Sequence, residues 1–189
     1  VEMIRRNVEL EARLIDDLVD LTCVSKGKLQ LHQHPVDAND LIQIALQICH
    51  SELAEKQIDI DLKLSASRSI VSADSARMQQ IFWNLLKNAV KFTPAGGRIS
   101  IFTSDTDTQG LRVEICDTGV GISPDVLPRI FNAFEQGARP QTGGLGLGLA
   151  ITRALVELHG GTIHAQSEGV DCGACFIIEL PTIRPSPVP

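Results

Sequence analysis

One segment places two amides and a lysine at spacings that suit a metal ion and a phosphate. Asn84, Asn88 and Lys91 stand at i, i+4 and i+7 within MQQIFWNLLKNAVKFT, so in an α-helix they share one face. An amide oxygen is a neutral ligand for Mg²⁺, and a lysine ammonium pairs with phosphate. The alternative is an ordinary solvated face. Asparagine is a mediocre helix former, which favours the ligand-binding interpretation.

A carboxylate and two glycines follow a strand-like segment. Residues 111–116 alternate apolar and polar side chains and lead to Asp117, Gly119 and Gly121. Glycines let the chain turn tightly with a ligand against its backbone, and the carboxylate can accept a hydrogen bond from that ligand. The same letters fit an ordinary Asx-turn, so both interpretations stand at this point.

A glycine-rich stretch, QTGGLGLGLAI, runs into an apolar helix-like segment at residues 141–151. It is not a P-loop, because no Lys-Ser/Thr closes it, and its spacing differs from the dinucleotide-binding Gly-x-Gly-x-x-Gly. Backbone N–H groups at a helix N-terminus favour anions, whereas glycine clusters are more often flexible turns. The candidate phosphate-binding residues are Gly144, Leu145, Gly146, Leu147 and Gly148.

The residues before these glycines have the pattern of a hinged lid. An apolar patch of Ile130, Phe131 and Phe134 leads into a loop that carries Arg139. A surface loop anchored by aromatic side chains fits this segment equally well.

Composition indicates a soluble globular chain. Of the 189 residues, 43% are hydrophobic, and the formal net charge of −6 disfavours a nucleic-acid groove. No apolar stretch reaches the ~20 residues of a membrane span, and the N-terminus lacks the apolar core of a signal peptide. The five cysteines are scattered, which suits reduced thiols in the cytoplasm. Cys172 and Cys175 have redox spacing but precede a strand, so we expect no redox role.

Residues 1–26 are expected to form a helix with two apolar sides. They lack Pro and Gly, and two sets of apolar residues recur along them at helical spacing. A lone surface helix needs only one apolar side, so this one is expected to pack in a helical bundle between chains. Lys26 and Gly27 supply its stop signal.

The remaining chain predicts an α+β domain, one mixed sheet covered by helices on one face. Helices are expected at about 37–57, with Leu41, Ala45 and Ile48 facing the core, and at about 75–92 and 147–159. The predicted order is αββαββ, a long loop, then αββ. Five of its six strands are placed, at about 58–64, 98–104, 111–116, 162–167 and 174–180. The expected divisions are a bundle helix in 1–30, the domain in 31–182 and a Pro-rich tail in 183–189.

In this order, the motifs resemble the N, G1, F and G2 boxes of the catalytic ATP-binding domain of bacterial sensor histidine kinases. The resemblance rests on Asn-x-x-x-Asn-x-x-Lys-Phe, Asp-x-Gly-x-Gly, Phe-x-x-Phe and Gly-x-Gly-x-Gly, and it covers about residues 37–181. Residues 1–26 resemble the second helix of the dimerisation and phosphoacceptor domain. The resemblance implies the Bergerat ATP-binding fold of gyrase-like and Hsp90-like ATPases. That fold is a two-layer α/β sandwich, here preceded by a long bundle-forming helix.

The resemblance also assigns roles by motif position. Asn88 would coordinate Mg²⁺, Lys91 would reach the phosphates of ATP, and Asp117 would accept the adenine amino group. Asn84 would sit beside the phosphates and is, with Lys91, a candidate catalytic residue. The other nucleotide-binding candidates are Phe92, Gly119, Gly121, Arg139, Gly144, Leu145, Gly146, Leu147 and Gly148.

One position separates a kinase from an ATPase within this resemblance. Gyrase-like and Hsp90-like ATPases carry a water-activating glutamate one turn before the magnesium asparagine, and here that position is Asn84. An amide cannot take a proton from water. The resemblance therefore implies phosphoryl transfer to a histidine rather than efficient hydrolysis.

The phosphate acceptor is missing from this chain. The family's acceptor lies in a His-Glu-x-x-x-Pro-like box, which none of the five histidines matches. We therefore expect an ATP-binding fragment that does not label itself, from a cytoplasmic kinase portion whose membrane anchoring stays open. Its partners would be an acceptor-helix histidine of the same or partner protomer, a response-regulator receiver domain and a second copy in a homodimer. The alternatives are a nucleotide-sensing or dimerisation module without phosphoryl transfer, and a GHKL-type ATPase, against which Asn84 argues.

Overall fold

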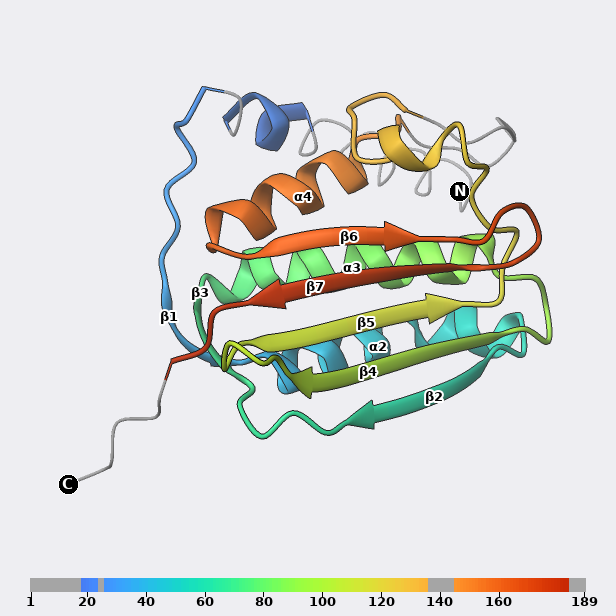
Figure 1. The fold of residues 1–189 in the computed structure, drawn as a ribbon, viewed down its shortest axis with the longest axis horizontal. Coiled ribbons are helices and arrows are strands. Elements are labelled where there is room, and N and C mark those ends of the chain that lie inside the picture. The colour runs from blue at the N-terminus through green and yellow to red at the C-terminus, as the bar shows by residue number, and fades with distance from the viewer. Residues whose placement is uncertain (1–17, 24–25, 136–144, 184–189) are drawn as a thin grey trace, which may run out of the picture.

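A computed structural model describes residues 18–23, 26–135 and 145–183. They form a five-stranded sheet with helices packed against one of its faces (Figure 1), which confirms the predicted two-layer α+β architecture. The expected N-terminal helix lies largely outside the described residues. Of that helix, residues 18–23 are helical, and Gly27 adopts a φ of +61° in the turn that follows. The three expected domain boundaries remain predictions.

The five-stranded sheet is mixed. Its spatial order is β2-β4-β5-β7-β6, in which β2 runs parallel to β4 and the other neighbours are antiparallel. Along β5, alternate side chains are fully buried beneath the helices, as the period of a half-buried strand requires. The strands are β2 (Asp59–Leu64), β4 (Arg98–Asp105), β5 (Leu111–Asp117), β6 (Thr162–Gln166) and β7 (Ala174–Leu180).

The helical layer consists of α2 (Ala38–Glu55), α3 (Ser75–Phe92) and α4 (Gly148–Leu158). In Figure 1, α2 and α3 lie behind the sheet, and α4 lies beside α3 near β6. Asp37 and Asp74 begin α2 and α3, because their carboxylates accept hydrogen bonds from backbone N–H groups of the first turns.

The core face of α2 differs from the prediction at one residue. Leu41 and Ala45 are buried as expected, but Ile48 is 52% exposed. The buried arc continues through Cys49 and Leu53, so Ile48 falls just outside it on the helix surface.

A second, two-stranded sheet was not located in the sequence. It pairs β1 (His34–Asp37) antiparallel with β3 (Ile70–Ala73). Each strand has four residues, and β1 contains Pro35, so neither carries a recognisable alternating run. A short 3₁₀ helix at Leu127–Arg129 likewise lies within the segment predicted as loop.

The cysteines require a correction. The structure joins Cys116 of β5 to Cys175 of β7 in a disulfide, whereas their scattered positions had indicated reduced thiols. The two residues are direct cross-strand partners, with Cα atoms 4.0 Å apart. Cys175 therefore pairs across the sheet and not with Cys172, which is free and exposed.

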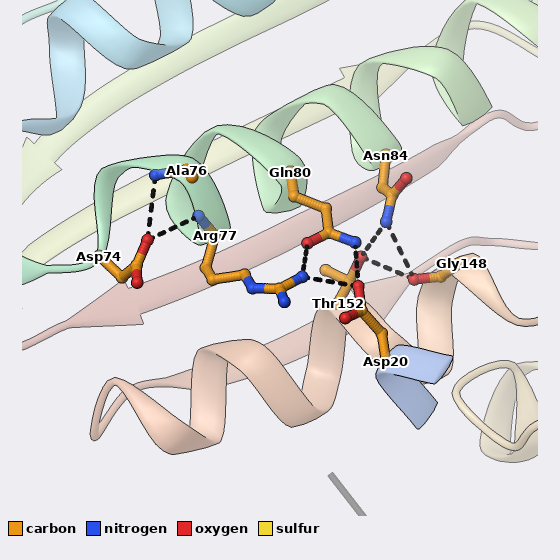
Figure 2. Close-up of polar contacts among 8 residues, drawn as sticks. All are labelled: Asp20, Asp74, Ala76, Arg77, Gln80, Asn84, Gly148 and Thr152. Carbon is orange, nitrogen blue, oxygen red and sulfur yellow. Dashed lines mark hydrogen bonds and ion pairs between the residues drawn. The ribbon is translucent and has the colours of Figure 1, made fainter. Parts of the chain in front are cut away.

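The segment 18–23 docks on the domain through one buried acidic residue. Asp20 is 7% exposed, and its Oδ2 accepts hydrogen bonds from Arg77 Nη1 at 2.6 Å and Gln80 Nε2 at 2.9 Å (Figure 2). Leu18 and Val19 of the same segment are exposed. None of the described helices is both long and apolar enough to span a membrane.

Candidate functional site

The polar face of α3 forms one wall of the candidate site. Asn84 is 8% exposed, and its Nδ2 lies 3.4 Å from both the carbonyl oxygen of Gly148 and Oγ1 of Thr152 at the start of α4 (Figure 2). Asn88, one turn later, is half-buried. Within the described residues, the Asn88 amide has no hydrogen-bond partner, so it is available to a ligand on the face it shares with Asn84.

The end of α3 carries a cation beside an exposed ring. The Lys91 ammonium lies 4.8 Å from the centroid of the Phe92 ring, and Phe92 is 37% exposed. Partial loss of hydration lowers the pKa of Lys91 from its ordinary value, because burial disfavours the charged form. An anion next to this ammonium would oppose that effect.

The loop after β5 closes against the end of α3. The backbone N–H of Val120 donates to the carbonyl of Phe92 at 3.2 Å. A Cβ at Gly119 would lie 2.6 Å from both that carbonyl oxygen and Oδ1 of Asp117, so only glycine allows this approach. Two of the predicted motifs, on α3 and after β5, are therefore in direct contact.

Asp117 ends β5 in a half-buried position. Oδ1 accepts a hydrogen bond from the backbone N–H of Gly119 at 2.8 Å. Burial raises the pKa of the Asp117 carboxyl above its ordinary value, and hydrogen bonds from the backbone N–H groups of Gly119 and Ala174 only partly offset this. The Asx-turn and the ligand interpretations are thus compatible, because one carboxylate can accept several hydrogen bonds.

The fold itself requires glycine at position 121, with or without a ligand. Its φ is +67°, and a Cβ there would lie 1.9 Å from the carbonyl oxygen of Gly169. Residue 121 also forms a β-bridge with Val170. The loop 169–173 thus packs on Gly121, and a contact between Gly121 and nucleotide remains a prediction.

The glycine-rich stretch leads into α4 as predicted, although its first part is not described. Arg139 and Gly144 lie outside the described residues. Gly146 has a φ of +71°, and its carbonyl accepts from the backbone N–H of Phe134 at 3.1 Å. Leu145 is exposed and Leu147 is buried. No side chain among the described residues caps the N-terminus of α4 at Leu147 and Gly148.

Three contacts in the site could not be found from the sequence motifs. Thr152 links Gly148 to Asn84. In the sequence it is only one residue of a predicted helix. Gly173 packs against Asp117, since a Cβ there would lie 2.0 Å from the Asp117 carbonyl oxygen; a glycine just before a strand was its only signal. Lys56 contacts the end of α3, and nothing in the sequence singles it out.

Two cavities among the described residues lie away from these motifs. One of about 510 Å³ opens at the other end of the sheet, where the β4–β5 turn meets Gly160 and Gly161. Another of about 360 Å³ lies between residues 127–131, α4 and β6. The candidate site is defined by convergent backbone and polar groups, and residues 136–144, expected to form its lid, are not described.

Known proteins are similar to this chain in sequence and fold. The family model for histidine kinase-, DNA gyrase B-, and HSP90-like ATPases matches residues 73–184. The chain is 33% identical to histidine protein kinase DivJ of Caulobacter vibrioides, over 90% of the chain and 28% of DivJ. It is 36% identical to the circadian input-output histidine kinase CikA of Synechococcus elongatus, over 89% of the chain and 23% of CikA.

A solved structure extends the similarity to three dimensions. The crystal structure of full-length ShkA in complex with AMPPNP superposes with a TM-score of 0.84 at 31% identity, over 99% of this chain and 39% of that one. The fold and its motifs thus define a histidine kinase-type catalytic domain. The chain belongs to the family of histidine kinase-, DNA gyrase B- and HSP90-like ATPases. It spans about a quarter of the length of DivJ and CikA.

Proposed function

We propose that this chain binds Mg-ATP and donates the γ-phosphoryl group to a histidine on an acceptor helix that the chain lacks. The observation that carries the kinase assignment is Asn84, a buried amide where hydrolytic relatives in the resemblance carry a glutamate. Its contacts with Gly148 and Thr152 hold it at the start of α4. An amide cannot deprotonate water, so the γ-phosphoryl is preserved for a better nucleophile.

The nucleotide would lie between α3, the loop after β5 and the start of α4. In this proposal Asp117 accepts a hydrogen bond from the adenine amino group, and Phe92 lines the adenine side. Backbone N–H groups of Gly146, Leu147 and Gly148 face the phosphates, where a helix N-terminus favours anions. The AMPPNP complex of ShkA supports nucleotide binding by this fold.

The residues of the site also suit Mg²⁺. The amide of Asn88 is a neutral oxygen donor without a protein partner in the described residues, and Mg²⁺ takes few protein ligands alongside phosphate oxygens and water. When bound, Mg²⁺ would neutralise charge on the phosphate oxygens. Asn88 is the residue proposed to hold it.

The protein's contribution to the transfer would be positioning and charge neutralisation. The bond from γ-phosphorus to the bridging oxygen of ADP breaks, and a bond from phosphorus to an imidazole nitrogen of the acceptor forms. Lys91 would neutralise part of the phosphate charge during this exchange, with the N–H groups of the α4 N-terminus. A receiver domain of a response regulator would then take the phosphoryl group from histidine, and the parent protein would act as a homodimer.

Calorimetric titration with ATP tests the site. We expect Mg²⁺-dependent binding by the wild type, weaker binding by Asn88→Ala and loss of binding by Asp117→Ala. Chelating Mg²⁺ with EDTA should reduce the wild-type affinity to that of Asn88→Ala. If the wild type binds no ATP under any of these conditions, the proposed site is excluded.

A second experiment separates a kinase from a nucleotide-sensing module. An acceptor-helix segment added in trans with Mg-ATP should become phosphorylated on histidine, while steady release of inorganic phosphate stays negligible. Binding without phosphohistidine would favour the sensing module, and steady phosphate release would favour a hydrolytic ATPase.

A further inference from the structure

The ammonium group of Lys56 lies against the C-terminal end of α3. Lys56 follows the last residue of α2, and its Nζ donates hydrogen bonds to the carbonyl oxygens of Val90 at 2.6 Å, Lys91 at 3.0 Å and Thr93 at 3.0 Å. An ammonium has three N–H donors. All three are used at this helix end, which leaves none for a phosphate.

The end of α3 needs an external donor for a local reason. In a continuing helix, the carbonyl of Val90 would accept from the N–H of residue 94. Residue 94 is proline, which has no N–H. Thr93 leaves the helix with a ψ of 128°, so the carbonyl of Lys91 also lacks an intrahelical donor. Lys56 supplies the donors and places a positive charge at the negative end of the helix dipole.

The last turn of α3, which Lys56 holds, connects two parts of the candidate site: the end of α3 and the loop after Asp117. Lys91 and Phe92 belong to it, with their side chains in contact. The carbonyl of Phe92, which lies between two carbonyls bound by Lys56, accepts the hydrogen bond from Val120 in the loop after Asp117. A displacement of this turn would therefore move Lys91, Phe92 and that loop together.

We propose that Lys56 is a positioning residue for nucleotide binding. Its ammonium fixes the last turn of α3 and thereby holds Lys91 and Phe92 in place for Mg-ATP, without contacting the nucleotide itself. The inference rests on the proposed function, because it concerns affinity for Mg-ATP.

Calorimetry on matched lysine variants tests this role. Lys56→Met keeps the hydrocarbon stem and removes the ammonium, and it should weaken Mg-ATP binding by roughly tenfold or more, because small displacements of positioning groups have large effects. Lys56→Arg, which keeps the charge and several donors, should recover most of that loss. Lys87→Met serves as the control, because Lys87 also ties α3 to α2, through Glu52, but away from the helix end. The affinity of Lys87→Met for Mg-ATP should stay within about twofold of the wild type, since a partly exposed ion pair contributes little.

Each outcome bears on the inference. A folded Lys56→Met protein, judged by circular dichroism, with wild-type affinity would overturn the role of Lys56 and leave the proposed function standing. A wild type that does not bind Mg-ATP would overturn both. Failure of Lys56→Arg to recover affinity would also contradict the role, because a donor at this helix end should suffice.

A second variant covers the case in which Lys56→Met does not fold. Lys56→Gln keeps a shorter amide donor. Hydrogen exchange of the Thr93 amide, which donates to the carbonyl of Ala89 at 3.0 Å, should be faster in this variant, and Mg-ATP binding should be weaker. Unchanged exchange and unchanged affinity together would overturn the proposal.

Discussion

At the scale of single residues, Asp117 shows how one carboxylate serves both the fold and the candidate site. It accepts backbone hydrogen bonds that shape the loop after β5, yet its pKa is raised because burial outweighs those bonds. A carboxyl group whose pKa rises on folding stabilises the protein at pH values below its unfolded pKa. That contribution is lost as pH rises through the folded pKa. At pH values above the folded pKa, the ionised Asp117 therefore opposes folding.

We expect Asp117→Asn to raise the melting temperature at pH 7 by a few degrees, as about 1 kcal/mol does in a chain of this size. Asparagine keeps an oxygen that can accept from Gly119 and carries no charge. The advantage should shrink as pH falls toward about 4, where an ordinary aspartate also becomes neutral. Thermal unfolding across this range checks the sign, with Asp107→Asn in the exposed β4–β5 turn as control. A variant less stable than wild type at pH 7 would contradict the argument.

Two glycines of the site should respond to alanine in opposite ways. A Cβ at Gly119 would clash at 2.6 Å with Asp117 and the Phe92 carbonyl, whereas a Cβ at Gly148 would only touch Asn84 at 3.9 Å. We expect Gly119→Ala to destabilise the fold by about 1–3 kcal/mol, as overpacking does. Gly148→Ala should unfold at or above the wild-type urea midpoint, because alanine favours helix.

The same pair separates structural from ligand roles. If the start of α4 binds phosphates, Gly148→Ala should lower ATP affinity without loss of stability. Unchanged affinity in this variant would remove Gly148 from the proposed nucleotide site.

At the scale of elements, α4 is joined to α3 and its N-cap residue at both ends of α4. Asn84 contacts the first turn of α4. At the other end, the buried His159 ring connects the carbonyl of Leu155 at 2.7 Å with the backbone N–H of Asp74 at 3.1 Å, so Nδ1 donates and Nε2 accepts. His159 is thus a structural residue, in keeping with the absence of an acceptor motif among the histidines.

His159→Phe should destabilise the protein by about 1–3 kcal/mol, because it leaves the part-buried N–H of Asp74 without its acceptor and removes one of the two hydrogen bonds to the carbonyl of Leu155. Denaturant unfolding gives the value. His164→Phe, on the exposed face of β6, is the control and should change stability by less than about 0.5 kcal/mol. Equal effects of the two substitutions would show that the ring of His159 is not a hydrogen-bonded link.

Elements with strong local signals could be predicted from the sequence. The bounds of α3 agree with the prediction, because an aspartate cap, an unbroken apolar stripe and a following proline define them within the segment itself. β1 and β3 could not be placed from the sequence, since each has four residues and is specified by its partner. The predicted order included a second strand before α3 but assigned it no residues. The Cys116–Cys175 bond likewise depends on the register between strands 59 residues apart in sequence.

In the candidate site too, local features could be predicted and contacts between elements could not. Residue types and motif order predicted its members, but their partners lie on other elements. Thr152 meets Asn84 from α4, and Lys56 reaches the end of α3 from the residue after α2. Such contacts depend on how helices pack, and no periodic pattern in the sequence indicates them.

At the scale of the whole molecule, the polar face of α3 serves two contacts. Its first half binds Asp20 of the preceding helical segment through Arg77 and Gln80 (Figure 2). Its second half carries Asn84 and Asn88. The Asp20–Arg77 pair is largely buried, so breaking it should cost more than an exposed ion pair does.

A double-mutant cycle of Asp20→Asn and Arg77→Met should give a coupling energy of about 1–2 kcal/mol in urea unfolding. Moderate salt should reduce it little, because buried pairs are weakly screened. The exposed pair Arg153–Glu157 on α4 is the matched comparison, expected below about 0.5 kcal/mol. A coupling energy near zero for Asp20 and Arg77 would mean that the preceding segment is not held by this contact.

The antiparallel pairing of β4 with β5 has a practical consequence. Ile99, near the start of β4, lies opposite Asp117, whereas Asp105 at its end lies opposite Leu111. The reversal returns the chain from the end of α3 to the same end of the strands, so the loop after Asp117 contacts Phe92. Residues 106–110 make the turn at the opposite end of the strands, a strand length away from the candidate site. A fluorescent label at the exposed Thr108 would therefore track the domain while leaving nucleotide binding undisturbed.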